Sequence, residues 1–251
     1  MLKAVFFDLD GTLLPMDEEK FTNLYFHLIS EAVKDRGYEP QKLIDTIWQG
    51  TKLMYKNDGN QTNEEVFWNY FGTVYGIEHL QDKKYFDEFY LNQFKKVKNA
   101  CGENPYAKDI IKYAKEKVGI VALSTNPIFP KNGIITRLAF LDLLEDDFDY
   151  ITTYENSFHC KPNPKYFQDL LYKFSLRGDE VILFGNNDME DYLCAKQVGI
   201  DCYLVGENLI LHEDAKVDVP KIKISEMKKI IEKEYNLSLI HISEPTRPIS
   251  I

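Results

Sequence analysis

The sequence predicts an α/β fold in which a doubly wound parallel sheet forms the core and an all-helical lobe is inserted into it. Three observations support this prediction. A short apolar run typical of a buried strand lies near the N-terminus, a long stretch with only helical periodicity follows, and strand-like and helix-like segments then alternate. We therefore expect a core made of residues 1–16 and 98–237, with residues 17–97 forming a helical cap on it.

The first strand is predicted at Ala4–Phe7, a continuous apolar run of aromatic and β-branched residues. The cap is predicted to contain four helices, because apolar residues recur there at the i, i+3, i+4, i+7 spacing of a buried stripe. Thr62 and Glu65 have the spacing of a capping box and mark the start of the third helix. The stripes are Phe21, Leu24, Tyr25, Leu28, Ile29 and Ala32; Leu43, Ile44, Ile47 and Trp48; Val66, Phe67, Tyr70, Phe71 and Val74; and Phe86, Phe89, Tyr90 and Phe94.

The remainder of the chain reads as repeated strand–helix units. Strands are predicted at 118–123, 150–153, 180–184 and 201–205, with helices at 131–140, 164–174 and 188–198. A last amphipathic helix is capped by Ser225 and ends at about Tyr235. Residues 238–251 contain two prolines, show no periodicity and resemble translated cloning sequence, so we expect a non-native or disordered tail and exclude it from the fold.

The charge balance restricts the kinds of partner. Asp and Glu total 40 against 30 Lys and Arg, which gives a formal net charge of −10. An acidic protein repels a polyanion at long range, so we do not expect it to bind a nucleic-acid backbone.

No stretch approaches the roughly 18 apolar residues of a membrane span, and Asp8 and Asp10 end the first apolar run too early for a signal peptide. We expect a soluble, cytoplasmic protein that acts on a small molecule.

The first candidate site is Asp8-Leu9-Asp10-Gly11-Thr12, directly after the first strand. Two carboxylates two residues apart are costly unless a cation or a shared proton relieves them, and Mg²⁺ is the natural partner. One carboxylate can attack phosphorus while the other transfers protons. The structural alternative is an acidic turn in which Asp10 caps a helix.

Three further polar segments follow predicted strands, and ligands bind at this edge of a doubly wound sheet. Ser124-Thr125-Asn126-Pro127 offers a hydroxyl and an amide for phosphoryl oxygens, although the same string is an ordinary turn. Lys161, flanked by Pro162, can contact a phosphate and a carboxylate, although most lysines are simply solvated. Residues 185–191 form an oxygen-rich turn that suits a hard cation, or an acidic helix N-terminus without function.

In this order and at strand ends, the four segments resemble the motifs of the haloacid dehalogenase-like hydrolase superfamily. The resemblance covers residues 1 to about 235, and the helical lobe corresponds to the cap that these proteins insert between motifs one and two. It implies a Rossmann-like core and a Mg²⁺-dependent phosphatase. By resemblance, Asp8 is the nucleophile that forms an aspartyl-phosphate, and Asp10 is the general acid and base.

The resemblance also implies roles for the other segments. Thr125, with Asn126 beside it, matches the phosphate-binding hydroxyl of motif two, and Ser124 is the other register. Lys161 matches the lysine of motif three. The metal set implied is Asp8, the backbone carbonyl of Asp10, and Asn186 and Asp191 of motif four.

Motif four departs from the family pattern at one position. The family usually has an acid directly after the glycine, where this chain has Asn186. An amide oxygen can ligate Mg²⁺ but supplies no charge. Either Asn186 ligates the metal weakly, or Asp188 or Asp191 supplies the charged contact.

We therefore expect Mg²⁺-dependent hydrolysis of a small phosphorylated metabolite. The alternatives are a 2-haloacid dehalogenase or a phosphomutase of the same superfamily, and a non-catalytic phosphate-binding protein with an impaired metal site. The sequence leaves nucleotide monophosphates and small sugar or carboxylate phosphates open. The aromatic residues of the cap can stack a nucleobase, but their helical spacing favours an ordinary core.

Overall fold

A computed structural model of the chain describes residues 1–215 and 217–243. Six parallel strands form one sheet in the order β3-β2-β1-β4-β5-β6. This is the strand order of a doubly wound sheet, so the predicted fold class is confirmed. The strands are β1 (Ala4–Phe7), β2 (Ile120–Leu123), β3 (Tyr150–Ile151), β4 (Val181–Gly185), β5 (Asp201–Val205) and β6 (Lys221–Ile222).

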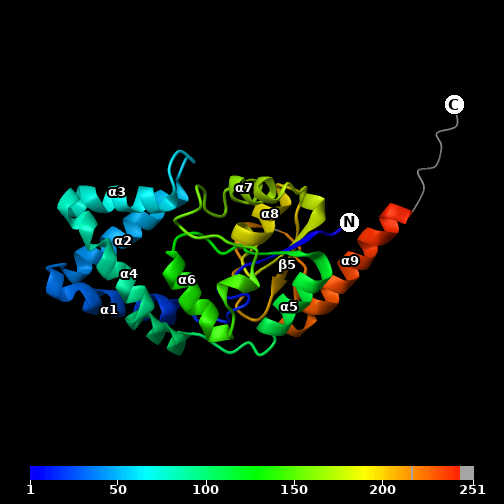
Figure 1. Cartoon of the computed structure of the whole chain (residues 1–251), viewed down its shortest axis with the longest axis horizontal. Coiled ribbons are helices and arrows are strands. Elements are labelled where there is room, and N and C mark those ends of the chain that lie inside the picture. The colour runs from blue at the N-terminus through cyan, green and yellow to red at the C-terminus, as the bar shows by residue number, and fades with distance from the viewer. Residues whose placement is uncertain (216, 244–251) are drawn as a thin grey trace.

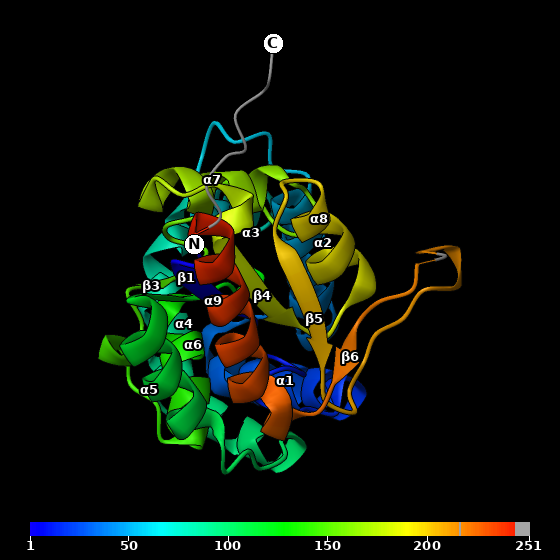
Figure 2. The same cartoon turned by 90° about the vertical axis from the view of Figure 1, so that its right-hand side faces the viewer.

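Helices cover both faces of the sheet, so its strands are apolar on both sides (Figure 2). Successive side chains of β1 alternate between the faces: Val5 and Phe7 join one apolar cluster, and Ala4 and Phe6 join the other. The first face is covered by α5 (Ala107–Val118), α6 (Lys131–Leu138) and α9 (Met227–Ser243). The second is covered by α7 (Lys165–Phe174) and α8 (Cys194–Lys196).

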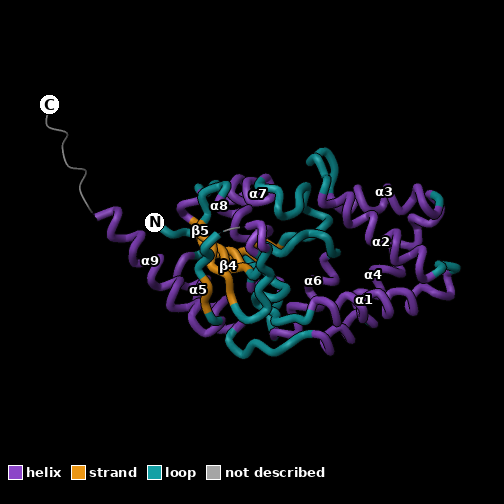
Figure 3. Tube along the Cα trace, turned by 180° about the vertical axis from the view of Figure 1, so that it is seen from behind, coloured by secondary structure: helices purple, strands orange, loops and turns teal. Residues whose placement is uncertain are grey.

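The four predicted cap helices are present as α1 (Glu18–Val33), α2 (Pro40–Tyr55), α3 (Asn63–Tyr75) and α4 (Lys83–Leu91). They form a lobe beside the sheet (Figures 1 and 3). The capping box of Thr62 and Glu65 at the start of α3 is confirmed. The chain enters and leaves the lobe through two adjacent segments, where the Asp17 N–H donates to the Ala100 carbonyl at 3.0 Å and the Gly102 N–H to the Pro15 carbonyl at 2.7 Å.

Several predicted boundaries were wrong. The helix predicted at 188–198 does begin at Asp188, where the Asn187 side chain caps it, but Asp188–Leu193 is a π-helix, in which the Tyr192 N–H donates to the Asn187 carbonyl, and α8 ends at Lys196. Ser225 does not cap α9, since it lies inside a 3₁₀ turn that leads into that helix. α9 also continues to Ser243, past the predicted end at about Tyr235, because no proline interrupts the chain before Pro245. The rest of the tail, 244–251, lies outside the described residues.

Two further points complete the comparison. The two-residue β6 was not predicted, since an exposed strand of that length has no periodicity to recognise. In residues 1–215 and 217–243, no helix is both long and apolar enough to cross a membrane.

Candidate active site

The candidate site lies at the carboxyl ends of the central strands. β1 and β4 are neighbours although they are far apart in sequence, and they pair over their whole length, with Phe7 beside Phe184. The chain connections leave in opposite directions at this point of the sheet, which opens a crevice at the strand ends. Asp8 follows β1 and Asn186 follows β4, so the topology brings motifs one and four to the same crevice.

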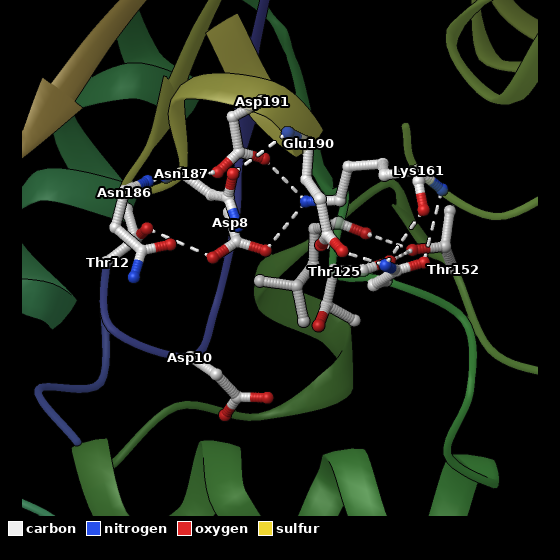
Figure 4. Close-up of polar contacts among 12 residues, drawn as sticks. Asp8, Asp10, Thr12, Thr125, Thr152, Lys161, Asn186, Asn187, Glu190 and Asp191 are labelled. Carbon is white, nitrogen blue, oxygen red and sulfur yellow. Dashed lines mark hydrogen bonds and ion pairs between the residues drawn. The ribbon is translucent and has the colours of Figure 1, made fainter. Parts of the chain in front are cut away.

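Asp8 is held by two side chains (Figure 4). Its Oδ1 accepts a hydrogen bond from Lys161 Nζ at 2.9 Å, and its Oδ2 accepts one from Thr12 Oγ1 at 3.0 Å. The carboxyl is buried. Burial raises the pKa of Asp8 to about 7, against the attraction of Lys161. The side chain is therefore fixed in place, and its charge depends on the cations around it.

Lys161 joins Asp8 to Asp191. Its Nζ lies 2.6 Å from Asp191 Oδ1, and both ion pairs are almost completely buried. Burial acts to lower the pKa of Lys161, but Asp191 and Asp8 together hold it well above its ordinary value. Asp191 Oδ2 accepts hydrogen bonds from the backbone N–H groups of Asn186 at 3.0 Å and Asn187 at 3.1 Å. Asp191 thus fixes both the lysine and the loop that follows β4.

Asp10 does not share this cluster, and its carboxylate points away from Asp8 (Figure 4). Its Oδ2 forms an ion pair with Arg137 Nη1, and its Oδ1 is buried with no partner in the described part of the chain. Arg137 is fully buried on α6, with its guanidinium 4.4 Å from the centre of the Phe129 ring. Sequence reasoning missed Arg137. The available signal was its place on the apolar stripe of that helix, three residues after Ile134 and one before Leu138, where an arginine requires a buried partner.

The hydroxyl and the amide predicted to bind phosphate have different surroundings. The Thr125 hydroxyl makes no hydrogen bond within residues 1–215 and 217–243, although the backbone carbonyl of Thr125 accepts from Thr152 and Tyr166. The adjacent Ser124 hydroxyl is buried and also unpartnered there. Thr125 and Ser124 both stay possible phosphate donors, since neither is committed to another group.

Asn126 is already engaged. Its amide nitrogen donates to Glu190 Oε2 at 2.9 Å, to the Tyr55 hydroxyl at 3.1 Å and to the Lys161 carbonyl at 3.2 Å. Its amide oxygen accepts the Lys161 N–H at 3.2 Å. Asn126 therefore positions the Lys161 loop. Tyr55 and Glu190 were not predicted as site residues, because contacts between the cap and the core leave no local pattern in the sequence.

Asn186 and Asp188 occupy different environments in motif four. The Asn186 side chain is buried beside Gly11, and its Nδ2 donates to the Asn208 carbonyl at 2.8 Å, which leaves its oxygen as the free ligand atom. Asp188 instead accepts the backbone N–H of His212 at 2.6 Å and pairs with its imidazole. Asp188 thus holds the loop after β5 and is not turned toward the Lys161 cluster.

The donors and the charge of the site fit a divalent cation. The buried acids Asp8 and Asp191, with the partly buried Glu190 and Asp10 beside them, outnumber the two cations Lys161 and Arg137. Burial raises the pKa of Glu190. Oxygen donors next to excess negative charge are what Mg²⁺ requires. No three or more Asp, Glu, His or Cys side chains in the described residues form a metal site by themselves, so an Asn186 oxygen, a backbone carbonyl and the substrate would have to complete it.

Comparisons with known proteins agree with this geometry. A family model for haloacid dehalogenase-like hydrolases matches residues 2–199. The structure is similar to the HAD phosphatase of Thermococcus onnurineus, with 20% sequence identity, a TM-score of 0.59, and 92% of this chain and 98% of that chain covered. No curated protein matches the chain.

Two other solved structures extend the likeness. One is the 2-haloacid dehalogenase of Pseudomonas syringae pv. Tomato, with 16% identity, a TM-score of 0.63, and 93% of this chain and 99% of that one covered. The other is the beta-phosphoglucomutase of Clostridium difficile, with 16% identity, a TM-score of 0.52, and 96% and 100% covered. At these identities the likeness establishes the fold and leaves the reaction to the site residues.

Proposed function

Because the chain belongs to the haloacid dehalogenase-like hydrolases, we propose that it hydrolyses a small phosphomonoester with Mg²⁺ through a phosphorylated Asp8. The observation that carries the proposal is the buried triad in which Lys161 bridges Asp8 and Asp191, at the switch point of the sheet. The lysine neutralises the nucleophile and is placed to contact the oxygens of a phosphoryl group. Thr125 and the backbone N–H groups after Asp8 supply neutral donors for the same oxygens.

The first half-reaction transfers the phosphoryl group to the protein. A carboxylate oxygen of Asp8 forms a bond to phosphorus, and the bond from phosphorus to the leaving oxygen breaks. Asp10 donates its proton to that oxygen, so the product leaves as an alcohol. Its Oδ1 is the atom suited to this transfer, since no group in the described residues occupies it.

The second half-reaction releases phosphate. A water molecule attacks phosphorus, Asp10 accepts the proton that the water loses, and the acyl-phosphate bond to Asp8 breaks. Asp8 and Asp10 then return to their starting protonation states. Arg137 holds Asp10 in position between the two steps and offsets its charge while it is ionised.

Mg²⁺ would be held by an Asp8 oxygen, the Asp10 carbonyl and the Asn186 side-chain oxygen. When bound, it supplies positive charge that offsets the charge of the phosphoryl oxygens and keeps Asp8 ionised. Asp191 uses both of its oxygens for Lys161 and the backbone, so we propose that it supports the metal indirectly by orienting the loop of Asn186.

Asp10 favours the phosphatase reaction over two of the three alternatives. A dehalogenase needs no acid two residues after its nucleophile, whereas this chain has Asp10 with a free buried oxygen. Phosphate binding alone would account for Lys161 between two carboxylates, but it would not require the free buried oxygen of Asp10. A phosphomutase shares both features and differs in the acceptor, so product identification with a sugar phosphate separates it from a hydrolase.

The direct test is the Asp8→Asn substitution. We expect it to abolish hydrolysis of para-nitrophenyl phosphate in the presence of Mg²⁺, because an amide cannot attack phosphorus at a useful rate. Circular dichroism checks that the variant is folded. Asp188→Asn is the matched control, since Asp188 contacts His212 instead of the cluster. Turnover by Asp8→Asn at the wild-type rate would rule out the proposed mechanism.

A further inference from the structure

A cavity of about 240 Å³ lies between the cap and the core. Half of the residues around it are aromatic, and they come from α1, α2, α3 and α4 and from two loops of the core. The aromatic residues are Phe21, Tyr25, Phe26, Trp48, Phe67, Trp68, Phe86, Tyr90, Phe129 and Tyr154. The stripes predicted as ordinary core thus also line a cavity.

The cavity reaches the candidate site through Asp10, which is one of its lining residues. In the proposed function, Asp10 donates a proton to the leaving oxygen. The leaving group must then lie within reach of Asp10, on the side of the cavity, while the phosphoryl group lies against Asp8 and Lys161. The walls of the cavity are therefore the surface that contacts the organic part of the substrate.

The charged residues around the cavity are all acidic. They are Asp10, Glu18 and Asp87, and no Lys, Arg or His of the described residues lines it, although Lys83 Nζ lies 3.9 Å from Asp87 Oδ2 and offsets part of its charge. Burial raises the pKa values of Glu18 and Asp87. Arg137 is not one of the lining residues; its Nη1 pairs with Asp10, its guanidinium lies 4.4 Å from the centre of the Phe129 ring, and its Nη2 is buried without a hydrogen-bond partner in the described residues. A second anionic group on the substrate would face carboxylates and the electron-rich faces of aromatic rings, which repel it.

The volume indicates which leaving groups the cavity accommodates, and the cavity is partly open to solvent at Trp48, which is 45% exposed. A cavity of about 150 Å³ lined by apolar residues holds benzene. At about 240 Å³, this one has room for a single ring with small substituents. Offset or edge-on contacts between rings stabilise an aromatic ligand beyond the contribution of its buried area.

We propose that the substrate is the phosphate ester of a single-ring aromatic alcohol that carries no second anionic group. This inference rests on the proposed function and specifies its leaving group. A neutral ring gains the aromatic contacts, and a ring with an ammonium substituent gains attraction to Glu18 and Asp87 as well. A carboxylate or a second phosphate on the leaving group loses both advantages.

The kinetic test uses three substrates that differ in one substituent: phenyl phosphate, 4-(aminomethyl)phenyl phosphate and 4-carboxyphenyl phosphate. We expect kcat/KM to be on the order of tenfold lower for the carboxylate than for the other two, because of its repulsion by the cavity acids. Glu18→Gln should reduce this difference. Equal or better hydrolysis of 4-carboxyphenyl phosphate, with phosphatase activity present, overturns the inference and leaves the proposed function standing.

A binding test works without catalysis. Both tryptophans of the chain, Trp48 and Trp68, line the cavity, so their fluorescence reports its occupancy. We expect phenylphosphonate, which cannot be hydrolysed, to change this fluorescence at lower concentration than 4-carboxyphenylphosphonate. Trp48→Ala should weaken the binding of phenylphosphonate. Leu53→Ala, at a similarly exposed apolar residue of α2 outside the cavity, is the matched control.

The two tests separate the two proposals. Fluorescence changes with phenylphosphonate, together with no hydrolysis of any ester or of acetyl phosphate, show that the cavity binds the ring but refute the proposed function and, with it, the assignment of a substrate. Hydrolysis of acetyl phosphate, together with no preference among the phosphonates and no effect of Trp48→Ala, refutes the cavity inference alone.

Discussion

The buried carboxyl of Asp8 is the residue on which the chemistry depends. Burial raises its pKa to about 7 from 3.8, so the protein without metal holds a proton on Asp8 at pH values where the unfolded chain has lost it. A nucleophile has to be ionised, and a cation beside Asp8 favours the ionised form. The site is thus built so that charge on Asp8 and a neighbouring cation stabilise each other.

This coupling predicts how stability depends on pH in metal-free buffer. Between pH 4 and about 7 the folded protein binds a proton on Asp8 that the unfolded chain does not, so its free energy of unfolding falls as the pH rises through this range. Asp8→Asn has no such proton. We expect the stability of the wild type relative to this variant to decrease from pH 4 to about 7 and then level off. Urea unfolding at a series of pH values measures it, and a pH-independent difference would contradict the raised pKa.

Asn186 is the second residue with a specific expectation. Asn186→Asp adds charge at the free oxygen of the proposed metal site, so we expect the Mg²⁺ concentration for half-maximal activity to fall on the order of tenfold. The same variant should be less stable without metal, because its carboxylate would face the Asn208 carbonyl that the amide now bonds. Thermal unfolding with and without Mg²⁺ measures both effects.

The adjacent asparagine gives the matched control. Asn187 uses its side-chain oxygen to accept the N–H groups of Met189 and Glu190, a role that Asp fills equally well. Asn187→Asp adds the same charge next door without adding a ligand. If both variants changed the Mg²⁺ requirement equally, the effect would come from overall charge, and Asn186 would not be a ligand.

At the scale of elements, α2 of the cap is tied to the core by its last residue. The Tyr55 hydroxyl donates to Glu190 Oε1 at 3.1 Å and accepts from Asn126 at 3.1 Å. Burial raises the pKa of Tyr55 and, by the same cause, that of Glu190. This contact brings the cap against the loops that hold Lys161 and Asp191.

Tyr55→Phe tests the contribution of this contact. The substitution keeps the ring and removes the hydroxyl, which leaves Glu190 Oε1 without its donor, so we expect a loss of about 1 kcal/mol in the free energy of unfolding. Denaturant unfolding measures the loss. Tyr172→Phe is the control, because Tyr172 is 88% exposed and its variant should match the wild type. A loss no greater than that of the control would show that the hydroxyl contributes nothing to closure of the cap.

The elements that could be predicted are those with a strong local period. The prediction of β1 rests on one continuous apolar run, and the prediction of each cap helix rests on apolar residues at helical spacing within one segment. Thr62 marks the start of α3, because its side chain caps that helix. A helix from Asp188 was predicted, but its π-helical geometry over Asp188–Leu193 was not, because that geometry depends on backbone hydrogen bonds such as the one from the Tyr192 N–H to the Asn187 carbonyl. The end of α9 was placed too early, since the stretch before Pro245 lacks an apolar stripe but contains nothing that breaks a helix.

At the scale of the whole molecule, the parallel topology explains why the candidate site residues could be predicted from the sequence to lie at one edge of the sheet. Asp8, Thr125, Lys161 and Asp191 each follow a strand or the segment after it, and parallel strands bring their carboxyl ends to one edge. Arg137 could not be found in this way, because its partner Asp10 lies more than a hundred residues away on a different element. The aromatic cavity also required the structure, since periodicity does not distinguish a packed stripe from a lining one.

The acidic residues behind the net charge of −10 are not spread evenly over the molecule. Part of the acidic excess is gathered at the crevice around Lys161 and Arg137, and another part surrounds the aromatic cavity. In the proposed function, a phosphoryl group depends on Lys161 and a divalent cation for its attraction to an otherwise acidic molecule. The same distribution disfavours substrates with a second negative charge.

The central claim, that Asp8 carries the phosphoryl group during turnover, is tested most directly by trapping the intermediate. Protein mixed with a radiolabelled phosphomonoester and Mg²⁺ is quenched in acid, digested, and its labelled peptide identified by mass spectrometry. We predict label on the peptide that contains Asp8, and none on the same peptide of Asp8→Asn. Hydrolysis that proceeds without any labelled protein, or label that persists in Asp8→Asn, would contradict the account.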